Sequence, residues 1–219
     1  MKNYCEIIGY KLEKEHTEIK VAMKGNWEKH IKRFAKNGKL GGELKIDDGR
    51  TISAEQRKKI YACVRDIAMY CGEYPEYTKE LMKYFYMERT GIEHFSLSKC
   101  PMTLARDFIS FIIEFAFEND IPFSDLGINR TDDIEKYLWS CLEYKKCCIC
   151  GAEAETHHTD AIGAGRDRLH YDDSDHRKMA LCREHHTEAH KAGVETFNEK
   201  YHVFGVIYRE GRKNEELSR

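Results

Sequence analysis

The sequence has 219 residues, of which 41% are hydrophobic and 34% charged, with a formal net charge of -2. This composition can build one large or two small folded domains and excludes collagen-like, low-complexity and disordered chains. The most apolar stretch, 108–117, contains Ser110 and Glu114 and is shorter than the roughly 18 apolar residues of a membrane-spanning helix. Glu6 lies where a secretory signal would be apolar, so we expect a cytoplasmic protein without a membrane anchor. In a reducing compartment the nine cysteines indicate metal binding or burial rather than disulfides.

Charge and metal-binding residue types are unevenly distributed along the chain. Residues 20–65 carry 13 Lys and Arg against five Asp and Glu, whereas residues 66–140 carry seven against 14. A basic segment is expected on a surface that binds phosphates, and a solvated basic face that binds nothing is the alternative. Eight of the 11 His lie between 157 and 202 and five of the nine Cys between 141 and 182, which predicts a domain boundary near residue 140.

The N-terminal residues predict a hairpin followed by a short basic helix. Alternation over 5–12 and 17–23 favours two strands, and a third is expected over 43–46. The helix is predicted over 26–36, with Trp27 and Phe34 on its apolar side, where we expect them in the core rather than stacked on bases. Its other side carries four candidate phosphate contacts, whose binding would weaken with salt: Lys29, Lys32, Arg33 and Lys36.

Three helices are predicted between residues 53 and 118. Ser53 and Gln56 match a capping box that opens a helix ending at Gly72. Its core positions are Ile60, Cys63, Val64, Ile67 and Cys71. The other two helices cover 76–89 and 101–118, with Pro101 in the first turn. Because the last one is apolar around nearly its whole circumference, it must be buried on all sides. We predict a homodimer that buries it, with burial inside one chain as an equal alternative.

The connection between the two parts of the chain is predicted to be helical. A helix capped within 131–133 runs to about 145 and leads directly into the segment rich in His and Cys. No Gly/Ser linker separates them. We therefore expect two domains, 1–140 and 141–219, held at a defined angle.

Two short knuckles repeat one ligand spacing. Cys147 and Cys150 are separated by two residues, and Cys182 and His185 repeat that gap after 31 intervening residues. Four such ligands are typical of a tetrahedral structural zinc site with no open position. Cys148 competes with Cys147, and the spacing favours Cys147. The alternative is a set of small buried thiols beside a surface histidine.

The other histidines of this segment predict a second metal site. His157 and His158 lie in an expected strand, where neighbouring side chains point to opposite sides, so they should have different roles. His186 and His190 share one face of a helix ending near residue 193, while His185 is turned away. His157, His186 and His190 could hold a divalent cation with open positions that stabilises charge on a phosphodiester. His158 could then remove a proton from water; histidines clustered around a single zinc are the alternative.

These residues carry a resemblance to a known family. The order Cys147-x2-Cys150-Gly151, His157-His158 and Leu181-Cys182-x2-His185-His186-x3-His190 resembles the HNH endonucleases of the ββα-metal fold, particularly the zinc-stabilised branch of bacteriophage genomes. The resemblance covers about 147–192. It implies that His158 is the general base, that His157, His186 and His190 bind the catalytic Mn2+ or Mg2+, and that Cys147, Cys150, Cys182 and His185 bind Zn2+.

Two features near this motif leave alternatives open. Many HNH proteins carry an Asn shortly before the second knuckle, whereas residues 175–178 read Asp-His-Arg-Lys. His176 is the nearest candidate for that position, with a surface histidine as the alternative. Between the two strands, Gly163 and Gly165 precede Arg166 and Arg168, which are candidate DNA contacts because glycine admits a close phosphate and Arg grips it with two donors. A turn with solvated arginines is equally compatible.

The region before the motif carries a second resemblance. Residues 50–59 and 95–101, set before an HNH module, resemble phage proteins that couple a nuclease to an Orf (NinB)-type recombination mediator domain. This implies a homodimer that binds single-stranded DNA near a single-strand-binding protein and assists recombinase loading.

The combined prediction is an α+β protein with a DNA-binding and dimerisation domain of mixed helices and strands and a small zinc-braced ββα-metal nuclease domain. It would hydrolyse phosphodiesters in single-stranded or branched DNA formed during recombination, in the bacterial host cytoplasm if a phage encodes it. A non-catalytic mediator whose zinc module only binds DNA, and a junction resolvase, are the two alternatives.

Overall fold

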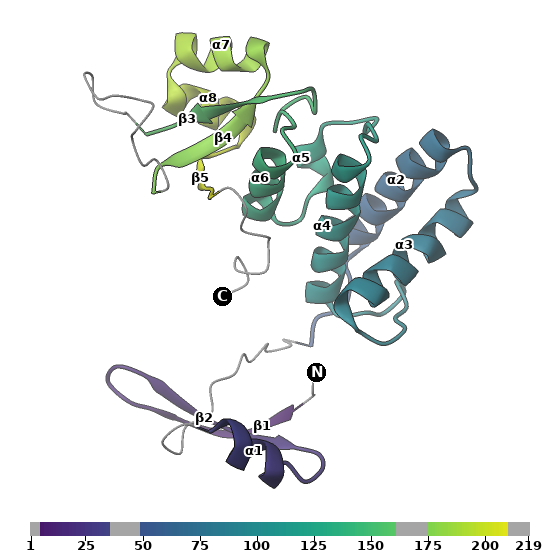
Figure 1. Cartoon of the computed structure of the whole chain (residues 1–219), viewed down its shortest axis with the longest axis vertical. Coiled ribbons are helices and arrows are strands. Elements are labelled where there is room, and N and C mark those ends of the chain that lie inside the picture. The colour runs from purple at the N-terminus through teal and green to yellow at the C-terminus, as the bar shows by residue number, and fades with distance from the viewer. Residues whose placement is uncertain (1–4, 36–48, 161–174, 210–219) are drawn as a thin grey trace. The chain divides into compact units, whose positions relative to one another are not determined.

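A computed structural model describes residues 5–35, 49–160 and 175–209 (Figure 1). Contacts divide the chain into two compact units, 1–48 with 87–94 and 49–86 with 95–219. The second unit contains residues on both sides of position 140, and the domain boundary expected there stays a prediction. Every helix in the described ranges is too short or too polar to cross a membrane.

The first unit contains the expected hairpin and short helix. β1 (Cys5–Leu12) pairs antiparallel with β2 (Thr17–Met23), and α1 (Glu28–Phe34) follows. The three described cations of α1, Lys29, Lys32 and Arg33, are exposed. Phe34 is 57% exposed, so its expected place in a core is wrong for the described residues. A helix of seven residues offers only a small apolar stripe, and β2 is itself exposed throughout. Lys36 and the strand expected over 43–46 lie outside the described residues.

α2 (Ala54–Cys71) begins and ends as predicted. The Ser53 hydroxyl accepts from the Gln56 backbone N–H at 3.0 Å, and the Gln56 side chain accepts from the Ser53 N–H at 3.0 Å. Gly72 ends the helix in the left-handed conformation, with φ of 71°. Four of the five predicted core positions are buried, whereas Cys71 is exposed because it lies beyond Ala68, the last buried residue of this helix. α3 (Pro75–Thr90) follows.

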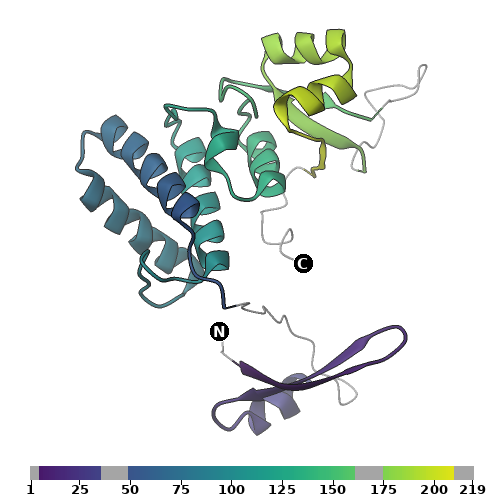
Figure 2. The ribbon, with the colours of Figure 1, turned by 180° about the vertical axis from the view of Figure 1, so that it is seen from behind.

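α4 (Met102–Glu118) has more buried residues than any other described helix of the second unit, and Figures 1 and 2 show its course. It starts one residue after Pro101, and its burial on nearly all sides is confirmed: Phe108, Ile109, Ile112 and Ala116 are fully buried. α4 is contacted within the same chain by α2, by α5 (Gly127–Arg130) and by α6 (Ile134–Glu143). α3 packs on it as well, because the Tyr86 ring lies 5.3 Å from the rings of Phe108 and Phe111. This is burial inside one chain, and the homodimer stays a prediction.

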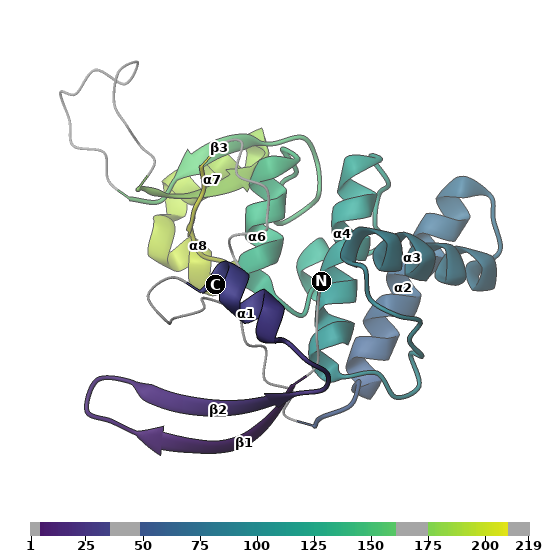
Figure 3. The same cartoon turned by 60° about the horizontal axis from the view of Figure 1, so that its bottom comes forward.

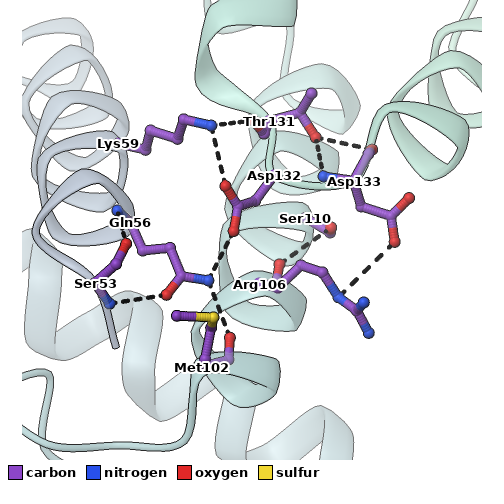
Figure 4. Close-up of polar contacts among 9 residues, drawn as sticks. All are labelled: Ser53, Gln56, Lys59, Met102, Arg106, Ser110, Thr131, Asp132 and Asp133. Carbon is purple, nitrogen blue, oxygen red and sulfur yellow. Dashed lines mark hydrogen bonds and ion pairs between the residues drawn. The ribbon is translucent and has the colours of Figure 1, made fainter. Parts of the chain in front are cut away.

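A polar network ties α2 to the start of α4 and to the segment before α6 (Figure 4). The Gln56 amide donates to the Met102 carbonyl at 3.0 Å and to the Asp132 carboxylate at 2.7 Å. Lys59 donates to the same carboxylate at 3.0 Å. Asp133 then caps α6 by accepting from the Lys136 backbone N–H at 3.1 Å, within the range predicted for the cap. These contacts hold the beginning of α6 against the helical core.

α6 leads from this core directly into the described residues after 143, which we call the C-terminal module (Figure 2). It contacts α4 as well as β4 (Arg177–Leu181) and β5 (Val206–Ile207). The buried Tyr137 hydroxyl donates to the Cys148 carbonyl at 3.0 Å, and the rings of Trp139 and Tyr208 lie 5.5 Å apart. The expected helix is therefore confirmed, although it ends at Glu143 rather than 145. The division into domains 1–140 and 141–219 at a defined angle stays a prediction.

The contribution of the Tyr137–Cys148 hydrogen bond to stability can be measured by mutation. In Tyr137→Phe the buried Cys148 carbonyl loses its donor, so we expect the free energy of unfolding to fall by about 1–3 kcal/mol. Urea denaturation followed by circular dichroism measures the change. Tyr77→Phe, at an exposed position of α3, is the matched control. A Tyr137→Phe midpoint equal to that of the control would contradict the proposed contribution of this contact.

The C-terminal module contains a three-stranded antiparallel sheet in the order β3 (Glu155–His158), β4, β5 (Figures 1 and 3). His157 lies opposite Met179, and His158 lies opposite Lys178. α7 (Arg183–Ala192) follows β4 directly and packs on it, and α8 (Val194–Tyr201) packs on α7. β3, β4 and α7 form the expected ββα arrangement, whereas α8 and β5 were not expected.

Candidate metal centres

The first knuckle is a tight turn between α6 and β3. The Cys147 backbone N–H donates to the Ala152 carbonyl at 2.7 Å, and the Gly151 N–H donates to the Cys147 carbonyl at 2.8 Å. Gly151 has φ of 73°, which only glycine adopts without strain. The second knuckle is the first turn of α7, with Cys182 at its N-cap and His185 three residues later. The turn before β3 and the first turn of α7 therefore present two candidate ligands each.

The two knuckles bring the four predicted zinc ligands together. The ligand atoms of Cys147, Cys150, Cys182 and His185 all lie within 4.8 Å of one another. The sulfurs of Cys150 and Cys182 are 3.7 Å apart, and His185 Nδ1 lies 3.6 Å from Cys147 Sγ and 3.2 Å from Cys182 Sγ. Tetrahedral zinc with Zn–S bonds of ~2.3 Å separates its ligand atoms by roughly 3.5–3.8 Å. The four residues therefore fit a zinc ion.

The thiols of this group differ in acidity. Although burial raises it, the pKa of Cys182 falls to about 7, because the backbone N–H and ring of His185 donate to the sulfur. Burial raises the pKa of Cys147 to about 12. Zinc binding therefore has to displace a proton from Cys147. Cys148, the competing thiol, is buried outside the group of four, and its backbone bonds to Ala180 and Tyr137.

The three histidines predicted to hold a second cation also meet. His157 projects from β3, His186 and His190 project from α7, and their ligand atoms lie within 4.8 Å of one another. The Nε2 atoms of His186 and His190 are 3.1 Å apart, close to the roughly 3.0–3.4 Å between neighbouring nitrogens bound to one ion at ~2.1 Å. The ring centroid of His157 lies 4.7 Å from that of His186 and 5.0 Å from that of His190.

His157 carries the clearest sign of a missing partner. Its side chain is 2% exposed, and its Nε2 lacks a hydrogen-bond partner among the described residues. A buried polar atom without a partner is costly unless something else binds it. Burial, together with the charges of His186 and His190, lowers the pKa of His157 to about 4. The ring is therefore neutral near pH 7 and offers a lone pair, which fits a metal ligand.

His158 lies apart from this group of three. It follows His157 in β3 and is half-buried, and alternation along the strand directs it to the opposite face. His176 is half-buried just before β4, and neither group of metal-binding side chains in the described ranges includes it. Arg166 and Arg168 lie outside the described residues.

Glu155 contacts the site but was not among the predicted residues. Its carboxylate accepts a hydrogen bond from Nδ1 of His186 and another from Arg183 at 3.2 Å, and these two bonds lower the pKa of Glu155. A sequence signal was available, because residues two apart in a strand share a face, and Glu155 is two residues before His157. Only the fold places the carboxylate beside α7.

The site is thus built from two strands followed by a helix, with three imidazoles where β3 and α7 meet and a Cys/His group of four at the turn before β3 and the start of α7. The family model described as "Putative HNHc nuclease" matches residues 25–217, most of the chain. The protein belongs to this HNH nuclease family. The match includes the helices before the knuckles, so these are part of the family's own sequence pattern.

No curated protein and no solved structure matches the chain. The resemblance of residues 50–59 and 95–101 to an Orf (NinB)-type domain, and the membership of a phage branch, stay predictions.

Proposed function

We propose that the protein is a metal-dependent DNA endonuclease that hydrolyses phosphodiester bonds. The observation that carries this proposal is the group of three imidazoles, one of which has a buried nitrogen with no hydrogen-bond partner in the part of the chain that the structure describes. A structural zinc site does not require these three histidines in addition to its own four ligands. Their number also leaves coordination positions for water and phosphate.

The chain's own residues divide the work as follows. His157, His186 and His190 would hold the divalent cation, which when bound supplies Lewis-acid stabilisation of charge on the phosphate. His158, on the other face of β3, takes a proton from the attacking water, a role suited to imidazole near neutral pH. Structural Zn2+ would be held by Cys147, Cys150, Cys182 and His185. It would thereby tie the turn before β3 to the start of α7.

The donor set and the family's common cofactors together indicate which cations to test. Three imidazoles favour transition metals over Mg2+. We expect activity with Mn2+ and also with Mg2+, on which HNH enzymes commonly run. The proposed Zn2+ in the four-ligand site, by contrast, has no open position for chemistry.

The proposed substrate is single-stranded or branched DNA of the kind formed during recombination. Support comes from charge: Lys29, Lys32 and Arg33 are exposed on α1 within the basic segment 20–65. Lys36, Arg166 and Arg168 are proposed as further phosphate contacts. The mediator role, the homodimer and the contact with a single-strand-binding protein or recombinase belong to the same proposal.

A panel of DNA structures combined with a metal series tests this function. The zinc-loaded protein is incubated with single-stranded, duplex, flapped and four-way DNAs in Mn2+, Mg2+ or no added metal, with His186→Ala as the inactive control. We expect cleavage of single-stranded or branched DNA that requires Mn2+ or Mg2+. Binding without cleavage under every condition would favour a non-catalytic mediator, and cleavage of four-way DNA alone would favour a junction resolvase.

A further inference from the structure

The imidazole of His186 contacts a different kind of group at each of its two nitrogens. Its Nδ1 bonds to the carboxylate of Glu155, while its Nε2 lies 3.1 Å from Nε2 of His190 inside the three-histidine group. A neutral imidazole carries one N–H, and a carboxylate can only accept. The bond to Glu155 therefore places the proton on Nδ1 and leaves the lone pair of Nε2 directed into the group.

We propose that Glu155 is a positioning residue, which fixes the tautomer and ring orientation of His186 so that Nε2 can bind the catalytic cation. The inference rests on the function proposed above for the three histidines. A carboxylate hydrogen-bonded to the second nitrogen of a ligating histidine orients the ring and raises its basicity. Glu155 would act through His186 and would not touch the cation itself.

The surroundings of Glu155 support this role. Glu155 and His157 share one face of β3, so the same short strand supplies one ligand and the orienting group of another. Arg183, the first residue of α7, donates to the same carboxylate oxygen at 3.2 Å. The carboxylate is thus held by two residues of the helix that carries His186 and His190.

The negative charge of Glu155 would also raise the affinity of the site for a dication. Three neutral imidazoles bring no negative charge to a dication, whereas the carboxylate beside His186 brings one. Glu155→Gln separates the two contributions, because an amide oxygen can still accept from Nδ1 but carries no charge. Glu155→Ala removes both.

Calorimetric titration of the zinc-loaded full-length protein with Mn2+ tests the proposal without measuring activity. We expect Glu155→Ala to weaken Mn2+ binding by about 10–100-fold and Glu155→Gln to weaken it less. Glu199→Ala, which removes an exposed carboxylate from α8, is the matched control and should bind Mn2+ like the wild type. Wild-type affinity in Glu155→Ala would overturn the proposal.

The tautomer of His186 provides a second readout, from 15N-resolved NMR of the zinc-loaded protein before Mn2+ is added. We expect the proton on Nδ1 in the wild type and in Glu155→Gln, and a loss of this preference in Glu155→Ala. An unchanged tautomer in Glu155→Ala would overturn the inference even if Mn2+ binding fell.

If the wild type bound no Mn2+ at all, the proposed function would fail, while the tautomer would still decide whether Glu155 positions His186. Should Glu155→Ala not fold, the wild-type spectrum still decides, because a proton on Nε2 of His186 instead of Nδ1 would overturn the inference.

Discussion

Replacing His158 with alanine is expected to slow DNA cleavage by about 10²–10⁴-fold, the usual contribution of a general base. The loss should fall on the chemical step, because His158 lies outside the group of three histidines that would bind the cation. Mn2+ affinity and zinc content should therefore equal those of the wild type. Single-turnover cleavage of the best substrate, with metal content measured on the same samples, checks both expectations.

Two further variants sharpen this result. His157→Ala removes a proposed ligand, so it should lose Mn2+ binding as well as cleavage, whereas His158→Ala should lose only cleavage. His16→Ala, at an exposed position between β1 and β2, is the control for the loss of an imidazole. If His158→Ala cleaved DNA at the wild-type rate, or if it lost Mn2+ binding, the division of roles between the adjacent histidines would be wrong.

Loss of the proposed zinc site is expected to unfold the C-terminal module. Structural zinc in small modules binds with about 10–16 kcal/mol of apparent free energy, which equals or exceeds the whole stability of a typical domain. In Cys182→Ser, or after chelation, the amides of β3, β4 and α7 should therefore lose protection from hydrogen exchange. α2 and α4 should keep theirs, because they bury a separate set of apolar side chains.

α6 should show an intermediate response. One side of this helix contacts α4, and the other contacts β4 and β5, so unfolding of the module removes only some of its partners. Hydrogen exchange measured by mass spectrometry, together with the zinc content, checks this pattern. Cys71→Ser is the matched control, since Cys71 is an exposed thiol on α2. A Cys182→Ser protein with wild-type protection in α7 would contradict the zinc assignment.

Features that depend on neighbouring residues could be predicted with little error. The Ser53–Gln56 capping box, the end of α2 at Gly72 and the hairpin of β1 and β2 all form as predicted. Each depends on backbone conformation and side-chain hydrogen bonds within a few residues. The Cys and His spacings likewise selected the residues that the structure brings together in both groups, because a turn and a helix of known period determine where side chains three or four residues apart point. Metal binding by these groups stays a prediction.

Other features depended on which elements meet. Cys71 and Phe34 match an apolar pattern and are nevertheless exposed, because periodicity indicates a face but not whether another element covers it. The apolar circumference of α4 required burial without indicating which elements supply it, and the structure places α2, α3, α5 and α6 around it. The contact of Glu155 with His186 joins residues 31 positions apart, on a strand and a helix. The strand period puts Glu155 on the face of His157 but does not indicate that His186 lies beside it.

The sequence by itself thus determined the local elements and the sets of residues able to bind metal, since chain connectivity and side-chain chemistry act over short separations. Only the tertiary structure decided that Nε2 of His157 lacks a partner among the described residues, that the Glu155 carboxylate meets His186 and how α6 joins the helices to the C-terminal module. These depend on packing between distant segments, where burial makes an unpaired nitrogen costly and a hydrogen bond directional.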